Sequence, residues 1–108
     1  MEHRRADRRY DRRIDIEVIA DGAAGFTTYT RNVSLGGMYV ISDRALPFGT
    51  KVKLRFTVPT QAEIIEVEGE VRWVEAEDGD THGMGIQFGG LRARDVWAMN
   101  KFFERPAE

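Results

Sequence analysis

The sequence contains no cysteine, and this absence removes several kinds of chemistry at once. Thiol nucleophiles, thiolate metal sites and structural disulfides are all excluded. Histidine is scarce as well, with only His3 and His82, and no carboxylates stand at a spacing that would complete a metal site or a catalytic triad with them. No glycine-rich phosphate loop leads into a helix. The sequence therefore predicts no enzyme, no metal and no cofactor.

Long apolar runs are missing too. No segment approaches the roughly 18–20 apolar residues that span a membrane, and the basic N-terminus is not followed by the apolar stretch of a secretory signal. The 108 residues, 42% of them hydrophobic, suit one small domain with a single core. We therefore expect a cytoplasmic protein without membrane insertion.

Charge is unevenly distributed along the chain, whose net charge is −2. Residues 1–13 carry six arginines against three acidic residues, whereas the remainder carries 10 basic and 15 acidic residues. A protein that binds nucleic acid with its whole surface normally has a basic face on the fold itself. Because the body is acidic, we expect no nucleic acid polymer as partner. A local anion site needs only a local basic cluster.

Alternation of apolar and polar residues predicts six strands, at residues 14–20, 26–33, 37–42, 51–58, 62–76 and 82–89. Short turns separate them, which is typical of antiparallel strands. The pattern predicts an all-β fold, a six-stranded antiparallel β-barrel with a C-terminal α-helix. We expect residues 1–13 to form a flexible arginine-rich arm and residues 14–104 to form the barrel with its helix.

Two segments make more detailed predictions about packing. In the fifth strand the alternation places four side chains on one inner face: Ile65, Val67, Val71 and Trp73. Gly69 lies on the same face and predicts a bulge or a bend there. Residues 94–103 have helical spacing instead, with one apolar stripe made of Val96, Met99 and Phe103. Trp97 widens this stripe, and packing on the barrel is favoured over a dimer contact.

The arm repeats Arg-Arg-x-Asp three times over residues 4–15, as RRAD RRYD RRID. A guanidinium group matches phosphate with two parallel hydrogen bonds, stacks on aromatic bases and fits the O6/N7 edge of guanine. In an extended arm Arg9 and Arg13 would lie about 13 Å apart on the same side. A helical arm is not favoured, because like charges four residues apart repel each other in a helix. The alternative to an arm that binds an anionic ligand is a solvated tail.

A second polar segment, NVSLGG, occupies residues 32–37. Asn32 and Ser34 have the same parity, so both side chains face the same way if the strand continues. Gly36 and Gly37 would let the backbone turn or approach a ligand closely. The alternative is an ordinary turn held by side-chain-to-backbone hydrogen bonds.

Taken in this order, the two segments resemble the bipartite motif of the PilZ domain family. The motif reads RRYDRR at residues 8–13, before the first strand, and NVSLGG at residues 32–37, between strands two and three. GEVRWV and GMGIQF, at residues 69–74 and 83–88, are similar to that family's late strands. The resemblance covers about residues 8–103. It implies a β-barrel receptor for the second messenger cyclic di-GMP, whose arm closes onto the barrel when the ligand binds.

The resemblance also implies which residues bind the ligand. The arm would supply Arg8, Arg9 and Arg13 and the barrel would supply Asn32, Ser34 and Gly37, with Arg12 and Gly36 as secondary candidates. An earlier register, in which Arg4, Arg5 and Arg9 spell the arm motif, stays open. We choose the later one because its last arginine immediately precedes the first strand.

Asn32 departs from the family pattern, which often has aspartate at this position. Asparagine keeps an acceptor oxygen but loses the charge, and it cannot accept two hydrogen bonds from a guanine edge as a carboxylate does, so we expect binding to survive in a weaker form. The chain then signals to a separate, unidentified protein, as a monomer or a dimer. Two other hypotheses stay open, a PilZ-like interaction module that binds no nucleotide and a nucleic-acid-binding barrel with a basic arm.

Overall fold

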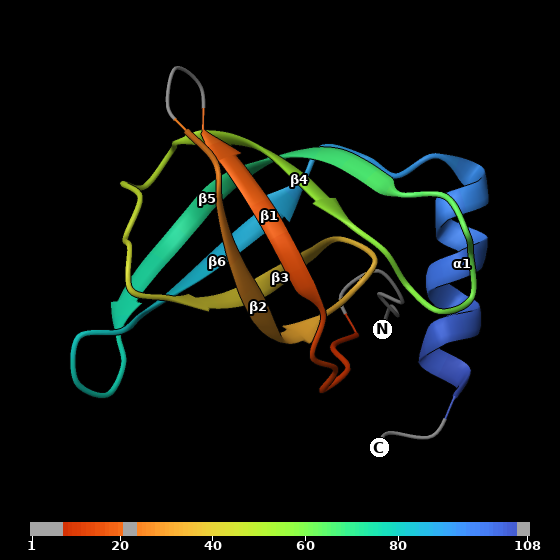
Figure 1. The fold of residues 1–108 in the computed structure, drawn as a ribbon, viewed down its shortest axis with the longest axis horizontal. Coiled ribbons are helices and arrows are strands. Elements are labelled where there is room, and N and C mark those ends of the chain that lie inside the picture. Colours follow the sequence, from red (N-terminus) through yellow and green to blue (C-terminus); the bar gives the residue numbers. More distant parts are fainter. Residues whose placement is uncertain (1–7, 21–23, 106–108) are drawn as a thin grey trace, which may run out of the picture.

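A computed structural model of the chain describes residues 8–20 and 24–105. It contains six strands and one helix: β1 (Asp15–Ala20), β2 (Phe26–Val33), β3 (Gly37–Ser42), β4 (Lys51–Phe56), β5 (Ile65–Ala76), β6 (His82–Phe88) and α1 (Ala93–Glu104). The strands close into an antiparallel barrel in the order β1-β2-β3-β6-β5-β4 (Figure 1). The predicted all-β barrel with a C-terminal helix is confirmed. Arg4 and Arg5 lie outside the described residues.

Closure of the barrel buries one face of each strand and explains the alternating sequence. In β4, for example, Val52, Leu54 and Phe56 are buried, while Lys51 and Lys53 are exposed and Arg55 is half-buried. β3 is the exception, because all six of its residues are buried. Its inward side chains fill the core, and its outward side chains are covered as well. Neighbouring residues on the outside of the barrel therefore cover β3.

The fifth strand departs from the predicted alternation after Val71. The pairing of β5 with β6 shifts register between Val71 and Trp73. The predicted irregularity thus lies after Val71 and not at Gly69, which stays in register with β4 and β6. The prediction that Trp73 shares the inner face is wrong, because the extra residue turns its side chain outward and leaves it 47% exposed.

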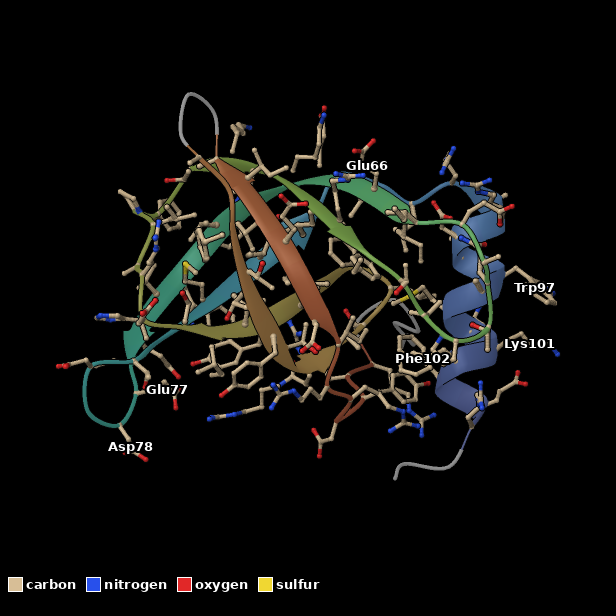
Figure 2. All side chains as sticks on the ribbon, viewed as in Figure 1. Glu66, Glu77, Asp78, Trp97, Lys101 and Phe102 are labelled. Atoms are coloured by element: carbon tan, nitrogen blue, oxygen red, sulfur yellow. The ribbon has the colours of Figure 1, made fainter. Side chains whose placement is uncertain are left out.

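Helix α1 lies beside the barrel (Figure 1) and packs on it through one stripe. Met99 and Phe103 are buried as predicted, and Ala98 joins them. Val96 is only half-buried. Trp97 does not widen the stripe, since its side chain is 59% exposed and points away from the barrel beside Lys101 (Figure 2). Within the described residues no helix is long and apolar enough to cross a membrane.

Replacement of Met99 by alanine tests this packing. Met99 is fully buried, so M99A leaves a cavity and should lower the free energy of unfolding by about 2–5 kcal/mol. The matched variant Trp97→Ala should change it by no more than about 0.5 kcal/mol, because Trp97 is exposed. Urea denaturation followed by circular dichroism measures both values. Equal losses in the two variants would contradict the assigned helix face.

Candidate ligand site on the barrel wall

The described part of the arm lies between β2 and α1. Tyr10 and Val33 exchange both backbone hydrogen bonds, at 2.9 and 3.0 Å, so the arm pairs with the end of β2. The Tyr10 ring stacks on Phe103 with 4.0 Å between centroids. Arg12 Nη2 donates to the backbone oxygens of Phe103 and Arg105, at 3.1 and 2.9 Å. A cation is favourable there, because the carbonyl groups at a helix C-terminus carry partial negative charge.

The arm arginines therefore have different surroundings. Arg9 Nη1 donates to Asn32 Oδ1 at 3.0 Å, on the outer wall of the barrel. Arg13 lies over the Tyr29 ring, 4.0 Å from its centroid, and pairs with Asp15 at 3.6 Å. Arg8 lies over the Tyr10 ring. Arg9 is thus the arm residue that joins the two halves of the sequence motif.

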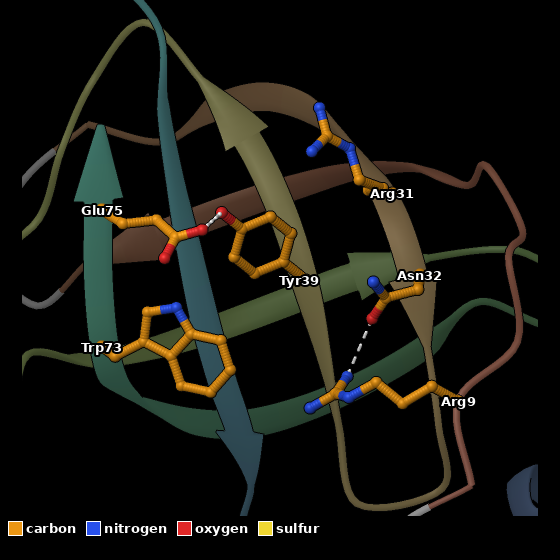
Figure 3. Close-up of a pocket in the computed structure, with 6 residues that line it drawn as sticks. All are labelled: Arg9, Arg31, Asn32, Tyr39, Trp73 and Glu75. Atoms are coloured by element: carbon orange, nitrogen blue, oxygen red, sulfur yellow. Dashed lines mark hydrogen bonds between the residues drawn. The ribbon is translucent and has the colours of Figure 1, made fainter. Parts of the chain in front are cut away.

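An open pocket of about 300 Å³ lies next to the Arg9–Asn32 hydrogen bond (Figure 3). Side chains from the arm, β2, β3 and β5 line it: Arg9, Arg31, Asn32, Tyr39, Trp73 and Glu75. Only two of these, Arg9 and Asn32, are among the residues predicted from sequence. The pocket combines two guanidinium groups, one carboxylate and an exposed indole on a single face.

The aromatic side of the pocket depends on bare backbone in β6. A Cβ atom at Gly83 would overlap the hydroxyl of Tyr39, and one at Gly85 would lie 3.1 Å from the Trp73 ring. Glycine at these two alternate positions therefore lets both aromatic side chains lie across β6. The ring centroids of Tyr39 and Trp73 are 6.0 Å apart.

The Tyr39 hydroxyl is held by two carboxylates at the edge of the pocket. Glu75 Oε2 lies 2.7 Å and Glu77 Oε2 lies 2.6 Å from the phenol oxygen, and its single proton serves one of them at a time. Burial and these two acceptors raise the pKa of Tyr39 above its ordinary value, so the phenol stays neutral. The hydrogen bond from Tyr39 and the charge of Arg31, 3.1 Å from Glu77 Oε1, lower the pKa of Glu77.

The other predicted barrel residues, Ser34, Gly36 and Gly37, form a turn beside the pocket and do not line it, and neither do Arg8, Arg12 and Arg13 of the arm. β2 ends at Val33, so the parity argument that placed Ser34 on the same side as Asn32 is wrong. Ser34 Oγ is buried and accepts hydrogen bonds from the backbone N–H groups of Gly36 and Gly37, both at 3.1 Å. The turn is also bonded to the end of β6, because Phe88 N donates to Gly36 O at 2.8 Å. A ligand contact by these three residues stays a prediction.

Four pocket residues were missed by sequence reasoning, namely Arg31, Tyr39, Trp73 and Glu75. Strand alternation was used to find the core, and their side chains lie on the outer wall. One signal was present in the sequence. Gly83 and Gly85 share one face of a single strand, and glycine inside a strand indicates that another group approaches closely.

Comparison with known proteins identifies the family and the fold. The chain matches the PilZ domain over residues 2–103, and it therefore belongs to the PilZ domain family, a family of non-catalytic receptors for cyclic di-GMP. No protein with a curated description matches it.

Two solved structures share the fold. The inhibitor of motility MotI/DgrA from Bacillus subtilis superposes with a TM-score of 0.73 at 21% sequence identity, over 93% of this chain and 52% of that one. The chain thus spans about half the length of the Bacillus protein. The PilZ domain of CeSA from a cellulose-synthesizing bacterium gives a TM-score of 0.65 at 20% identity, over 90% of this chain and 95% of that one.

Replacement of Gly37 by alanine separates the turn from the ligand contact. A Cβ at Gly37 would overlap the backbone oxygen of Ile86, so G37A should lower the free energy of unfolding by about 1–3 kcal/mol. At Gly89 a Cβ would lie 3.5 Å from its nearest neighbour, and G89A should stay within about 0.5 kcal/mol of the wild type. Thermal and urea unfolding measure both. A stable G37A protein that loses ligand would make Gly37 a binding residue.

Proposed function

We propose that this chain is a receptor for cyclic di-GMP, with the ligand bound between the arm and β5. The observation that carries the proposal is the Arg9–Asn32 hydrogen bond. It brings together the two halves of the PilZ motif, 23 residues apart in sequence, at the mouth of one pocket. Family membership supports the choice of ligand.

The chemistry of the pocket fits one half of such a ligand. Cyclic di-GMP has two guanines and two phosphates in a closed ring. Arg9 and Arg31 offer donors for phosphate or for the O6/N7 edge of guanine, and the exposed face of Trp73 offers a stacking surface. A volume of about 300 Å³ is at the lower end for small-ligand pockets. One guanine would occupy the pocket, and the rest of the ligand would lie over the arm.

The arm contacts support a switching mechanism. Arg9 reaches the pocket only when the arm lies along β2, so a ligand that contacts Arg9 stabilises the docked arm. The same arm segment contacts the C-terminal end of α1 through Tyr10 and Arg12. Docking would thus change the surface around α1, which a separate cytoplasmic protein reads. Mobility of the arm without ligand stays a prediction, and so does the register of its repeat.

Calorimetric titration with cyclic di-GMP tests the proposal. Arg9→Ala should weaken binding by about 10- to 100-fold, because charge-assisted hydrogen bonds contribute roughly 1.5–3 kcal/mol. Arg44→Ala removes the same charge from a residue outside the pocket and should change affinity little. GMP should bind much more weakly than the cyclic dinucleotide, because it presents a single base and a single phosphate.

Absence of saturable binding to the wild type would overturn the receptor proposal. The chain would then be a PilZ-like interaction module, and Arg9→Ala would leave partner binding intact. Equal loss in Arg9→Ala and Arg44→Ala would instead attribute the effect to net charge and not to the pocket.

Tryptophan fluorescence gives an independent test, because the chain has two tryptophans in different places. Trp73 lines the pocket and Trp97 is exposed on α1. In a Trp97→Phe variant, cyclic di-GMP should quench the remaining fluorescence, since the guanine stacks on Trp73. In a Trp73→Phe variant, the same titration should leave the Trp97 emission nearly unchanged. Quenching of equal size in both variants would contradict the assigned stacking surface.

A further inference from the structure

The two sides of the pocket have opposite hydrogen-bonding character (Figure 3). On the side of β2 and the arm, the Asn32 oxygen already accepts from Arg9. The groups left for a ligand are mostly donors, namely the Asn32 amide N–H groups and the free N–H groups of Arg9 and Arg31, beside one remaining lone pair of the Asn32 oxygen. On the side of β5, Glu75 presents a carboxylate, which only accepts. Trp73 lies on the same side as Glu75, and both come from β5.

Guanine has the same polarity. One edge carries the acceptors O6 and N7, and the adjoining Watson–Crick edge carries the N–H donors at N1 and at the 2-amino group. Adenine has an amino donor beside N7 and no 2-amino group, so it matches neither side as well. A base stacked on Trp73 with O6/N7 toward Arg9 would direct its donors toward Glu75.

Glu75 can meet such a base without leaving Tyr39 unsatisfied. The Tyr39 hydroxyl has a second acceptor at 2.6 Å, Glu77 Oε2. Glu77 is held in place by Arg31 at 3.1 Å. When Glu75 turns to a ligand, the buried phenol keeps one hydrogen bond and the cost of an unpaired buried donor is avoided.

We propose that Glu75 determines the specificity of this pocket for guanine, by accepting hydrogen bonds from N1–H and the 2-amino group. The inference rests on the proposed function and adds a residue from β5 to it. It also gives a structural reason for Asn32. The negative charge that the family often has at the position of Asn32 is here supplied from the opposite side of the pocket.

Affinity alone does not test this inference. Glu75 attracts the base donors but repels the ligand's phosphates, so its removal changes total affinity in either direction. The ratio of affinities for two ligands with identical phosphates isolates the base contact. The suitable pair is cyclic di-GMP and its hypoxanthine analogue, cyclic di-IMP, which lacks only the 2-amino groups.

The experiment measures both dissociation constants for the wild type, Glu75→Ala, Glu75→Gln and Glu68→Ala. The wild type should prefer cyclic di-GMP, and Glu75→Ala should reduce that preference by about tenfold, the loss expected for one hydrogen bond to a charged acceptor. Glu75→Gln keeps a neutral acceptor, so its preference for cyclic di-GMP should lie between those of the wild type and Glu75→Ala. Glu68→Ala removes the same charge from the same strand outside the pocket and should keep the wild-type ratio.

The possible results separate the two proposals. If Glu75→Ala shifts both affinities by the same factor, the receptor proposal stands and the role of Glu75 is overturned. If the ratio falls equally in Glu68→Ala, the effect is one of general charge and the inference is also overturned. If the wild type binds neither ligand, both proposals are wrong. Circular dichroism of each variant confirms that it is folded before binding is measured.

Discussion

Two glycines on the outer face of β6, Gly83 and Gly85, determine the shape of the barrel wall beside the pocket. Because Gly83 and Gly85 leave the backbone bare, Tyr39 from β3 and Trp73 from β5 lie across the strand from opposite sides. This contact covers β3 and brings Glu75 within hydrogen-bonding distance of Tyr39. A side chain at either glycine would push one aromatic residue away. The pocket thus follows from close approach between neighbouring strands, and no insertion or separate domain is needed to form it.

The described part of the arm contacts both the barrel wall beside the pocket and helix α1. Its backbone pairs with Val33 at Tyr10, and its arginines then contact different partners. Arg9 bonds to Asn32 beside the pocket, and Arg12 bonds to carbonyl groups at the end of α1. Any ligand that favours the Arg9 contact also favours the Arg12 contact, since both require the same backbone position. Under the proposed function, coupling between ligand and helix would need no larger rearrangement than docking of this segment.

The sequence predicted the barrel well because closure gives every strand one buried face. The same regularity explains the errors. At Trp73 a register shift after Val71 reversed the alternation, and at Ser34 the strand had already ended. Neither the register shift nor the end of β2 is visible in the alternation of apolar and polar residues. Arg9 and Asn32 were found because the family motif marks them, whereas Arg31, Tyr39 and Glu75 stand at ordinary strand positions. Only the order of the strands in the closed barrel, with β6 between β3 and β5, brings them together.

The position of charge in the pocket connects these observations. An aspartate at position 32 would compete for Arg9 as an ion pair and hold a formal charge beside the arm. Asparagine makes the same hydrogen bond with a neutral acceptor. The positive charge of the Arg9 guanidinium is therefore not offset by an adjacent carboxylate and can attract an incoming anion. The carboxylate of the pocket is that of Glu75 on β5, which lies within hydrogen-bonding distance of the Tyr39 hydroxyl. Glu77 is a second acceptor for the phenol proton. If guanine binds as proposed, this separation of the cation from the anion across the pocket would favour one orientation of a base with distinct donor and acceptor edges.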